Sequence, residues 1–255
     1  LPRAANPVRC VSPALSPWTN CSQLYDFKIM RIFIKNILSI IAVLLVLPYA
    51  VMAQGRAPQP KEVLTSMQDA LKGLGTADFE FSFQAFGQDG AVLGDERGHF
   101  VAQGEAFKLS TGSVTVFCDG QVKWIYDMVN EEVTIFPHDV TSVDPAENPF
   151  AVLEKADASM YSFKGGTENG KAGDGRALYT IDMVPKNKNL SFTSLRITVS
   201  ADTFLPVAVT YMSRTGDRYE LRIISVNSVE TKPSDFFVPS QELMDNPDIY
   251  ITDMR

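Results

Sequence analysis

The segment Val114–Pro137 constrains the fold more than any other part of the chain, because apolar and polar residues alternate along three short runs within it. The residues that share a face within the first or the second run are Val114, Val116, Cys118, Val122, Trp124 and Tyr126. Asp119-Gly120 lies between these runs and predicts a two-residue type I′ turn, since Gly adopts positive φ readily. A second turn near Asn130 precedes Val133 and Ile135. The segment is therefore predicted to be an antiparallel β-meander.

Similar alternation on both sides of this segment predicts that the meander belongs to a larger antiparallel sheet. Phe79, Phe81 and Phe83 alternate with polar residues, so one face of an early strand carries three aromatic rings. Further strands are predicted at Val92–Val101, Phe107–Leu109, Ala177–Val184, Leu190–Ser200, Leu205–Tyr211 and Tyr219–Val226. The glycines of Gly165–Gly175 predict a loop.

Two segments instead repeat apolar residues at helical spacing. The first starts at Pro60 and ends at Gly73, and the second is the short segment Phe150–Ala156. About nine antiparallel strands with two or three helices predict an α+β domain. An open sheet of this length curls. Its concave face is then either filled by the helices or left as a cavity, and periodicity alone does not distinguish these outcomes.

The N-terminal region divides into two parts that we expect to lie outside the folded domain. Residues 30–53 have the three parts of a secretory signal peptide: a basic start, an apolar run over Ile37–Leu47, and small residues up to Ala53. The apolar run is too short to span a membrane, which takes about 20 residues. Residues 1–29 precede this signal and are interpreted as a misannotated or non-native upstream extension. Residues 54–255 are then one domain, exported to the periplasm and soluble there.

Composition and motifs exclude most enzyme and nucleic-acid functions. The formal charge is −7, and no basic cluster occurs in residues 54–255. The chain contains two histidines, His99 and His138, and neither lies near other ligands at metal-binding spacing. No nucleophile, phosphate-binding or dinucleotide motif is present, so we expect no catalytic residues, cofactor or metal. Cys118 is the one cysteine after residue 53, and we interpret it as a buried structural thiol.

Several short motifs resemble the family of periplasmic outer-membrane lipoprotein carriers, the LolA family. They are Asp119-Gly120 followed by Trp124, Tyr126 and Asp127, then Asn148-Pro149-Phe150, and Phe236-Phe237-Val238-Pro239 near the end. The resemblance implies an incomplete, strongly curved antiparallel β-barrel, or half-barrel, with helices covering a concave hydrophobic face. It also implies a monomer that takes acylated lipoproteins from an inner-membrane ABC-type releasing complex. The carrier shields their acyl chains and delivers them to the outer membrane, where a receptor is an open question.

The resemblance also implies that a set of apolar residues lines the acyl-binding cavity. They are Met67, Leu71, Phe79, Phe81, Phe83, Trp124, Tyr126, Ile135, Phe150, Leu153 and Phe192. Without the resemblance, each of these residues is more simply explained as ordinary core. Family members carry an Arg that hydrogen-bonds the covering helix, and the matching position here is Gln103. Any latch at this position therefore lacks a charge.

Two other functional classes remain open at this point. One is a sensor or regulator of the same fold that binds a lipid or a protein without carrying it between membranes. The other is an interaction module whose concave face is filled, which predicts that no lipid binds. An enzyme is the least favoured class.

Overall fold

The computed structural model describes residues 57–144, 148 and 150–255. The expected upstream extension, residues 1–29, and the expected signal peptide, residues 30–53, lie outside the described residues. Contacts group Ala57–Arg255 as one unit.

Helix α2 (Pro60–Gly73) is the first element of this unit, and its limits match the sequence prediction. Its start is fixed by Pro60 in the first turn and by the Gln59 backbone N–H, which donates to Glu62 Oε2 at 2.8 Å. The chain leaves the helix through Gly75, whose φ of 71° suits a residue without Cβ. The buried stripe of α2 consists of Pro60, Val63, Leu64, Met67 and Leu71.

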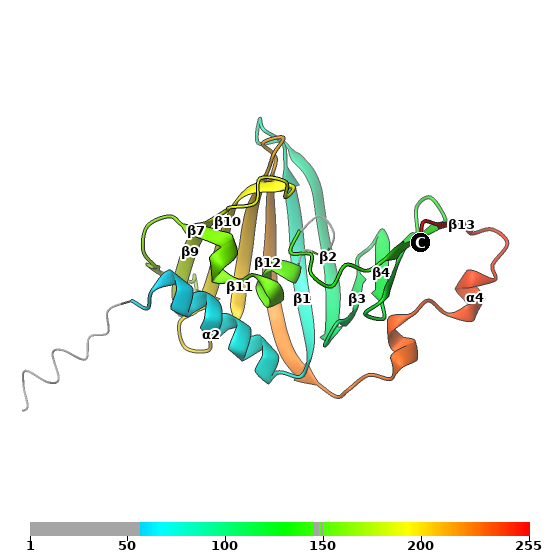
Figure 1. The fold of residues 1–255 in the computed structure, drawn as a ribbon, viewed down its shortest axis with the longest axis horizontal. Coiled ribbons are helices and arrows are strands. Elements are labelled where there is room, and N and C mark those ends of the chain that lie inside the picture. The colour runs from blue at the N-terminus through cyan, green and yellow to red at the C-terminus, as the bar shows by residue number, and fades with distance from the viewer. Residues whose placement is uncertain (1–56, 145–147, 149) are drawn as a thin grey trace, which may run out of the picture. The chain divides into compact units, whose positions relative to one another are not determined.

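The described residues form one 13-stranded sheet (Figure 1). Its strands are β1 (Thr76–Phe86), β2 (Val92–Gln103), β3 (Ala106–Ser110), β4 (Val114–Cys118), β5 (Val122–Asp127), β6 (Glu132–Pro137), β7 (Tyr161–Phe163), β8 (Glu168–Lys171), β9 (Ala177–Pro185), β10 (Phe192–Ser200), β11 (Pro206–Ser213), β12 (Arg218–Val229) and β13 (Tyr250–Asp253). Their order is β13-β6-β5-β4-β3-β2-β1-β12-β11-β10-β9-β7, with β8 beside β9. Every pair is antiparallel except β13–β6.

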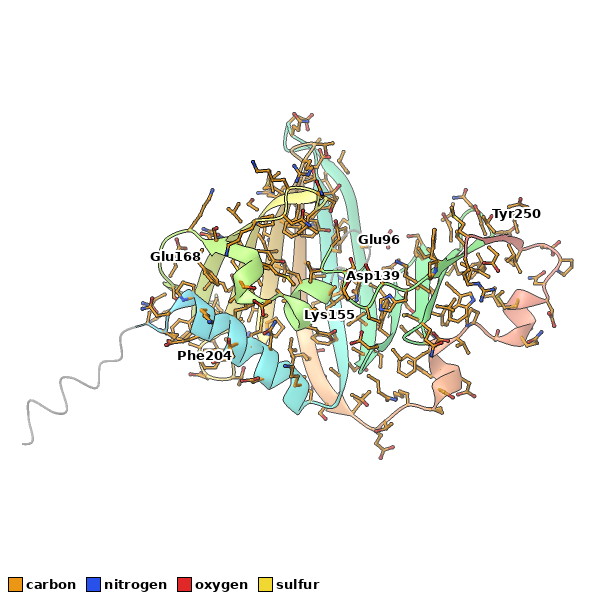
Figure 2. The ribbon with its side chains drawn as sticks, in the orientation of Figure 1. Glu96, Asp139, Lys155, Glu168, Phe204 and Tyr250 are labelled. Atoms are coloured by element: carbon orange, nitrogen blue, oxygen red, sulfur yellow. The ribbon has the colours of Figure 1, made fainter. Side chains whose placement is uncertain are left out.

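The sheet is curved and open, as the α+β half-barrel prediction requires. Its end strands β13 and β7 do not pair with each other. Tyr250 on β13 and Glu168 on β8 accordingly lie at opposite ends of the sheet (Figure 2).

Strand register assigns every side chain of β1–β6 to one of two faces. Residues directly opposite in a pair share a face, and Phe79 lies opposite Phe100, which lies opposite Leu109. Leu109 lies opposite Val116, and Val116 lies opposite Ile125. These residues define the concave face, and their sequence neighbours define the outer face.

Two helices cover the concave face. Helix α2 crosses the sheet, and helix α3 (Ala151–Lys155) lies beside it (Figure 1). Both contribute to one hydrophobic cluster with the inward residues of β1–β4 and β9–β12. Helix α3 confirms the short helix expected in Phe150–Ala156.

The C-terminal segment covers the outer face of β3–β6. It contains the 3-10 helix η2 (Ser234–Phe237), helix α4 (Gln241–Met244) and the edge strand β13. Phe237 is 1% exposed, and the Lys108 ammonium lies 4.8 Å and 4.9 Å from the ring centroids of Phe117 and Phe236. This cover explains why apolar residues occur on both faces of β3–β6.

Three local features differ from the sequence prediction. Part of the expected loop Gly165–Gly175 pairs with β9 as β8, because backbone hydrogen bonds require no apolar pattern. The weakly patterned C-terminal tail contributes α4 and β13. The first hairpin turn is centred on Gly120-Gln121, since Asp119 N donates to Val122 O at 3.3 Å. Gly120, with φ 94°, then occupies the first central position, where a II′ turn needs glycine.

We predict that Gly98→Ala destabilises the protein by about 1–3 kcal/mol. A Cβ on Gly98 would overlap the carbonyl oxygen of Ser110 and lie 2.7 Å from Phe81 Cζ. Gly94→Ala, in the same strand, is the matched control because its Cβ meets only the Ala85 Cβ at 4.0 Å. Urea unfolding of both variants measures the difference, and equal stabilities would contradict the prediction.

Candidate functional site

Phe150 stands at the centre of an aromatic cluster on the concave face. Its ring stacks on that of Phe100 with centroids 4.0 Å apart and an interplanar angle of 2°. The rings of Phe79 and Phe81 lie 5.2 Å and 5.3 Å from it at tilted or edge-on angles. Such pairs contribute about 0.5–1.5 kcal/mol each beyond simple burial. The residue preceding α3 therefore fills the middle of the concave face, where it is 1% exposed.

Three polar contacts hold α3 against its surroundings. Gln68 Nε2, on α2, donates to Ala156 O at 2.7 Å. Lys155 Nζ donates to Glu105 Oε2 at 2.6 Å and to Val140 O at 3.0 Å. The Glu105 side chain is half exposed, and an ion pair at such a site contributes less than about 1 kcal/mol. The apolar contacts of Phe150 thus hold this segment more strongly than its polar contacts do.

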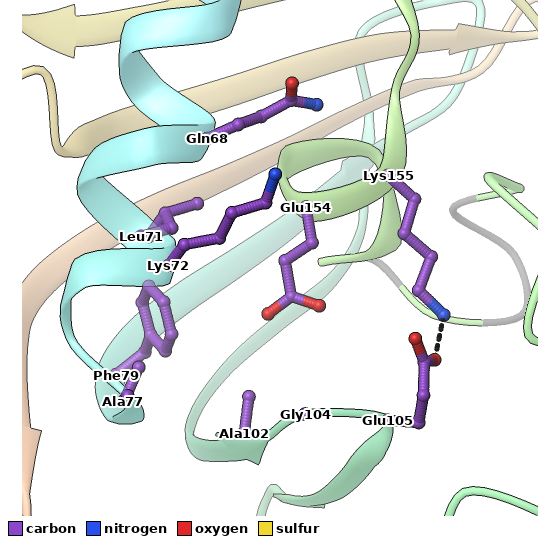
Figure 3. Close-up of a pocket in the computed structure, with 11 residues that line it drawn as sticks. Gln68, Leu71, Lys72, Ala77, Phe79, Ala102, Gly104, Glu105, Glu154 and Lys155 are labelled. Atoms are coloured by element: carbon purple, nitrogen blue, oxygen red, sulfur yellow. Dashed lines mark hydrogen bonds and ion pairs between the residues drawn. The ribbon is translucent and has the colours of Figure 1, made fainter.

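A pocket of 320 Å³ lies beside the aromatic cluster, where the C-terminal part of α2 faces α3 and the β2–β3 turn (Figure 3). Its volume is at the lower end of the range for small-molecule sites. The residues that line it are Gln68, Leu71, Lys72, Gly75, Ala77, Phe79, Ala102, Gly104, Glu105, Glu154 and Lys155. Phe79 belongs to both the pocket and the aromatic cluster, so the apolar wall of the pocket continues into the core.

Glu154 is the polar residue that most distinguishes this pocket. Its side chain points from α3 into the pocket (Figure 3). Desolvation raises the pKa of its carboxyl group from 4.5 to about 7; Lys155 lowers the pKa and Glu105 raises it to smaller extents. No described group donates a hydrogen bond to this carboxyl group. At neutral pH it therefore exists in both protonation states.

Eight of the eleven cavity candidates lie on the concave side. Met67, Leu71, Phe79, Phe81, Phe150, Leu153 and Phe192 are buried in the concave cluster, and Phe83 is partly buried against it. Of these residues, Leu71 and Phe79 also line the pocket. The sequence reasoning missed Phe100, although its position in the expected strand Val92–Val101 places it opposite Phe79.

The other three candidates, Trp124, Tyr126 and Ile135, lie on the outer face. This corrects the expectation that all eleven candidates line one cavity on the concave face. Trp124 is opposite Phe117 and Ile135 in the ladder, so it does not share a face with Cys118. A two-residue turn pairs an even-numbered residue with an odd-numbered one. Trp124 and Cys118 therefore could not face the same side, and the hairpin length already contained this information.

Gln103 does not latch α3, which corrects its expected role. Its Oε1 accepts hydrogen bonds from Thr76 Oγ1 at 3.0 Å and from Lys232 N at 2.8 Å, and its Nε2 donates to Lys232 O at 3.2 Å. Gln103 thereby ties the start of the C-terminal segment to β1 and β2. The contacts on α3 come instead from Gln68, Glu105 and Lys155, which the sequence reasoning did not identify. The charged pair Glu154-Lys155 within an otherwise apolar helix was the available signal.

The described residues offer little of what metal or thiol chemistry needs. Within the ranges that the structure describes, no group of three or more His, Cys, Asp and Glu could hold a metal ion. Cys118 is fully buried, and desolvation raises the pKa of its thiol to about 11, which suppresses the reactive thiolate. His99 is exposed on β2, whereas His138 is packed against the Phe107 ring, so the two histidines do not form one site.

No protein-family model and no curated protein matches the chain. Solved structures do resemble it. An uncharacterized conserved protein from Thermus thermophilus is 9% identical, with 75% of this chain and 97% of that chain covered and a TM-score of 0.48. A LolA superfamily protein from Nitrosomonas europaea is 9% identical, with 72% and 99% covered and a TM-score of 0.40. A putative outer membrane lipoprotein-sorting protein domain from Vibrio parahaemolyticus is 12% identical, with 69% of this chain and 94% of that chain covered and a TM-score of 0.40.

A LolA superfamily protein and a putative lipoprotein-sorting protein domain are thus among the solved structures that resemble this chain. With identities of 9–12% and TM-scores below 0.5, these likenesses carry no argument about a ligand or partner. Function has to be inferred from the geometry of the chain itself.

Across the described ranges, no helix is both long enough and apolar enough to cross a membrane.

We predict that Glu154→Gln stabilises the protein at pH 8 and has little effect at pH 4. The folded-state pKa lies above the unfolded value, so ionisation of Glu154 opposes folding. This penalty is absent below about pH 4.5 and complete above about pH 7. Removing it should raise the free energy of unfolding by about 1–3 kcal/mol at pH 8. Urea unfolding at both pH values tests this, and an effect that does not depend on pH would contradict it.

Proposed function

We propose that this protein is a periplasmic carrier that shields the acyl chains of lipoproteins and moves them from the inner to the outer membrane. The observation that carries the proposal is the covered concave face. A continuous apolar surface is closed by α2 and α3, and a pocket opens beside it at the edge of that cover. The sequence resemblance to lipoprotein carriers supports the same conclusion. So does the arrangement of polar contacts around α3, which are few and easily exchanged for water.

The energetics of acyl shielding require a cover that moves. Removing one methylene group from water contributes about 0.8 kcal/mol, so a 16-carbon chain contributes up to ~12 kcal/mol. Because Phe150 fills the centre of the concave face, an acyl chain has to displace it from Phe100 and Phe79. The loss of these ring contacts offsets part of the gain from binding. The carrier can then release its cargo.

The proposed route begins with export. Residues 30–53 act as a cleavable signal peptide, and the remaining chain works as a soluble monomer in the periplasm. Its partners are acylated lipoproteins, an inner-membrane ABC-type releasing complex and, where one exists, a receptor at the outer membrane. No cofactor or catalytic residue takes part.

A second candidate is an interaction module or lipid sensor of the same fold that does not carry cargo. The close packing of Phe150 against Phe79, Phe81 and Phe100 favours it, because the concave face is already filled in this conformation. A sensor binds an acyl ligand without transferring it, whereas a filled module binds none.

A transfer assay distinguishes these functions. A fluorescent acylated lipopeptide is placed in donor vesicles, and its appearance in acceptor vesicles is followed with and without the purified protein. A carrier accelerates transfer in proportion to its concentration and forms a soluble complex with the lipopeptide, visible by native mass spectrometry. A soluble complex without transfer would establish the sensor, and the absence of both would leave only the interaction module.

We predict that Phe150→Ala increases acyl-probe binding several-fold, because the ring no longer occupies the concave face. Phe237→Ala is the matched control, since Phe237 is also 1% exposed but lies in η2, next to Phe236, whose ring contacts Lys108 on the outer face. Both variants lose about 3–5 kcal/mol of stability, so thermal unfolding has to confirm that each is folded at the assay temperature. Titration with a fluorescent fatty-acyl probe gives the affinities. Equal increases in probe affinity in both variants would contradict the prediction, because they would show that general loosening of the fold, and not an emptied concave face, increases binding.

A further inference from the structure

We propose that the Glu154 pocket binds the protonated amine head group of an acyl or alkyl ligand whose chain enters the concave core. This inference rests on the carrier function proposed above and specifies the chemistry of its ligand. It assigns Glu154 as the polar anchor, and it assigns Leu71 and Phe79 as the first apolar contacts of the chain.

The pocket combines an apolar wall with the Glu154 carboxyl group, and Gln68, Lys72, Glu105 and Lys155 also line it. Leu71, Ala77, Phe79 and Ala102 provide the wall, and Phe79 leads from it to the ring of Phe150 at 5.2 Å. Glu154 points into the same space (Figure 3). An amphiphile that lies with its chain along the wall therefore brings its head group to the carboxyl group.

The charges around Glu154 favour a cation over an anion. Lys155, on the same helix, is already bound by Glu105 of the β2–β3 turn and by Val140 O. Lys72, on α2, is an exposed residue that also lines the pocket, and its side chain extends toward α3 (Figure 3). The strands β1 and β2 contribute only apolar side chains, Ala77, Phe79 and Ala102, to the pocket. No described donor binds Glu154, so its carboxyl group is available to a ligand ammonium group in the pocket.

The ionisation of Glu154 makes this site sensitive to pH. Burial raises the pKa of the carboxyl group to about 7, so it is neutral in mildly acidic solution and charged in mildly basic solution. An ammonium group binds the charged form more tightly and lowers the pKa of Glu154 in the complex. Affinity for the amine therefore rises as pH increases from about 6 to 8 and falls in the opposite direction. An opposite charge in contact shifts a carboxyl pKa by about 1–3 units. With a pKa of about 7 in the free protein, such a shift makes binding about five- to tenfold tighter at pH 8 than at pH 6.

Two biological sources carry this chemistry. A lipopeptide acylated on a glyceryl group but not on its N-terminus presents an α-ammonium group next to its chains. An ethanolamine phospholipid presents an ammonium group beside a phosphate. The shared feature is the amine, and the lipopeptide is the source that fits the carrier function.

The test measures binding of dodecylammonium and of dodecanol, its uncharged analogue, to the purified full-length protein at pH 6 and pH 8. Calorimetric titrations below the micellar concentration give the dissociation constants. We expect dodecylammonium to bind about five- to tenfold more tightly at pH 8 than at pH 6, while dodecanol shows no pH dependence. In Glu154→Gln the pH dependence of dodecylammonium binding disappears. Asp69→Asn is the control variant: it removes one charge from the exposed face of α2, and dodecylammonium binding remains dependent on pH.

A second arm separates the sources. A diacylated lipopeptide with a free N-terminus is compared with its N-acetylated form, and ethanolamine phospholipid with glycerol phospholipid. If binding prefers the free N-terminus and this preference depends on Glu154, the lipopeptide is supported as the ligand. If binding prefers only the ethanolamine lipid, the lipopeptide is rejected as the ligand.

The two proposals fail in different ways. If dodecanol and dodecylammonium bind equally at both pH values, the amine site is wrong and the acyl-binding function stands. If neither ligand binds, the acyl-binding function is wrong as well. The wild-type pH series needs no variant, so the test remains decisive even if Glu154→Gln folds poorly.

Discussion

The curved, open sheet of this protein presents an apolar concave face, and the cover over that face is the constraint on which the other features depend. A closed barrel would fill its interior from its own strands, whereas an open sheet needs other elements to exclude water. Here α2 and the segment around α3 provide this cover. Phe150 reaches furthest inward, because its ring stacks on Phe100 in the middle of the sheet. The position of α3 is therefore set by one apolar side chain more than by the helix itself, which has only five residues.

The same cover creates the unusual environment of Glu154. A carboxyl group on the inner side of a short helix loses water when the helix is seated, and desolvation then raises its pKa. The seated position is thus favoured by Phe150 and opposed by ionised Glu154, and these residues are only four positions apart. Lys155 and Gln68 add weaker polar contacts that water can replace.

The outer face of the sheet is covered by a different part of the chain. The apolar side chains of β3–β6 that turn away from the concavity are covered by η2 and the chain around it, while β13 extends the sheet beyond β6. Gln103 joins this C-terminal segment to β1 and β2 through Thr76 and Lys232. Phe117, in the hairpin that contains Trp124, and Phe236, in η2, both contact the Lys108 ammonium group, which links the hairpin to the C-terminal segment. The two apolar surfaces of the sheet have different covers, and the candidate site belongs to one of them.

The sequence by itself determined the class of fold and most of the helices and strands, but not β7, β8, α4 or β13. Three local patterns can be recognised without tertiary contacts. They are the helical spacing after Pro60, the alternation from Phe79 onward and the glycine near the first hairpin turn. The sequence also placed Phe150 and Leu153 in one short apolar segment, and the family resemblance placed that segment over the concave face. Only the tertiary structure decided which face of each strand is concave. The length of the hairpin already placed Trp124 and Cys118 on opposite faces, and the tertiary structure decided that the face of Trp124 is the outer one. It also decided that Glu154 loses its water and that Gln103 meets Lys232, since both follow from segments that lie far apart in the chain.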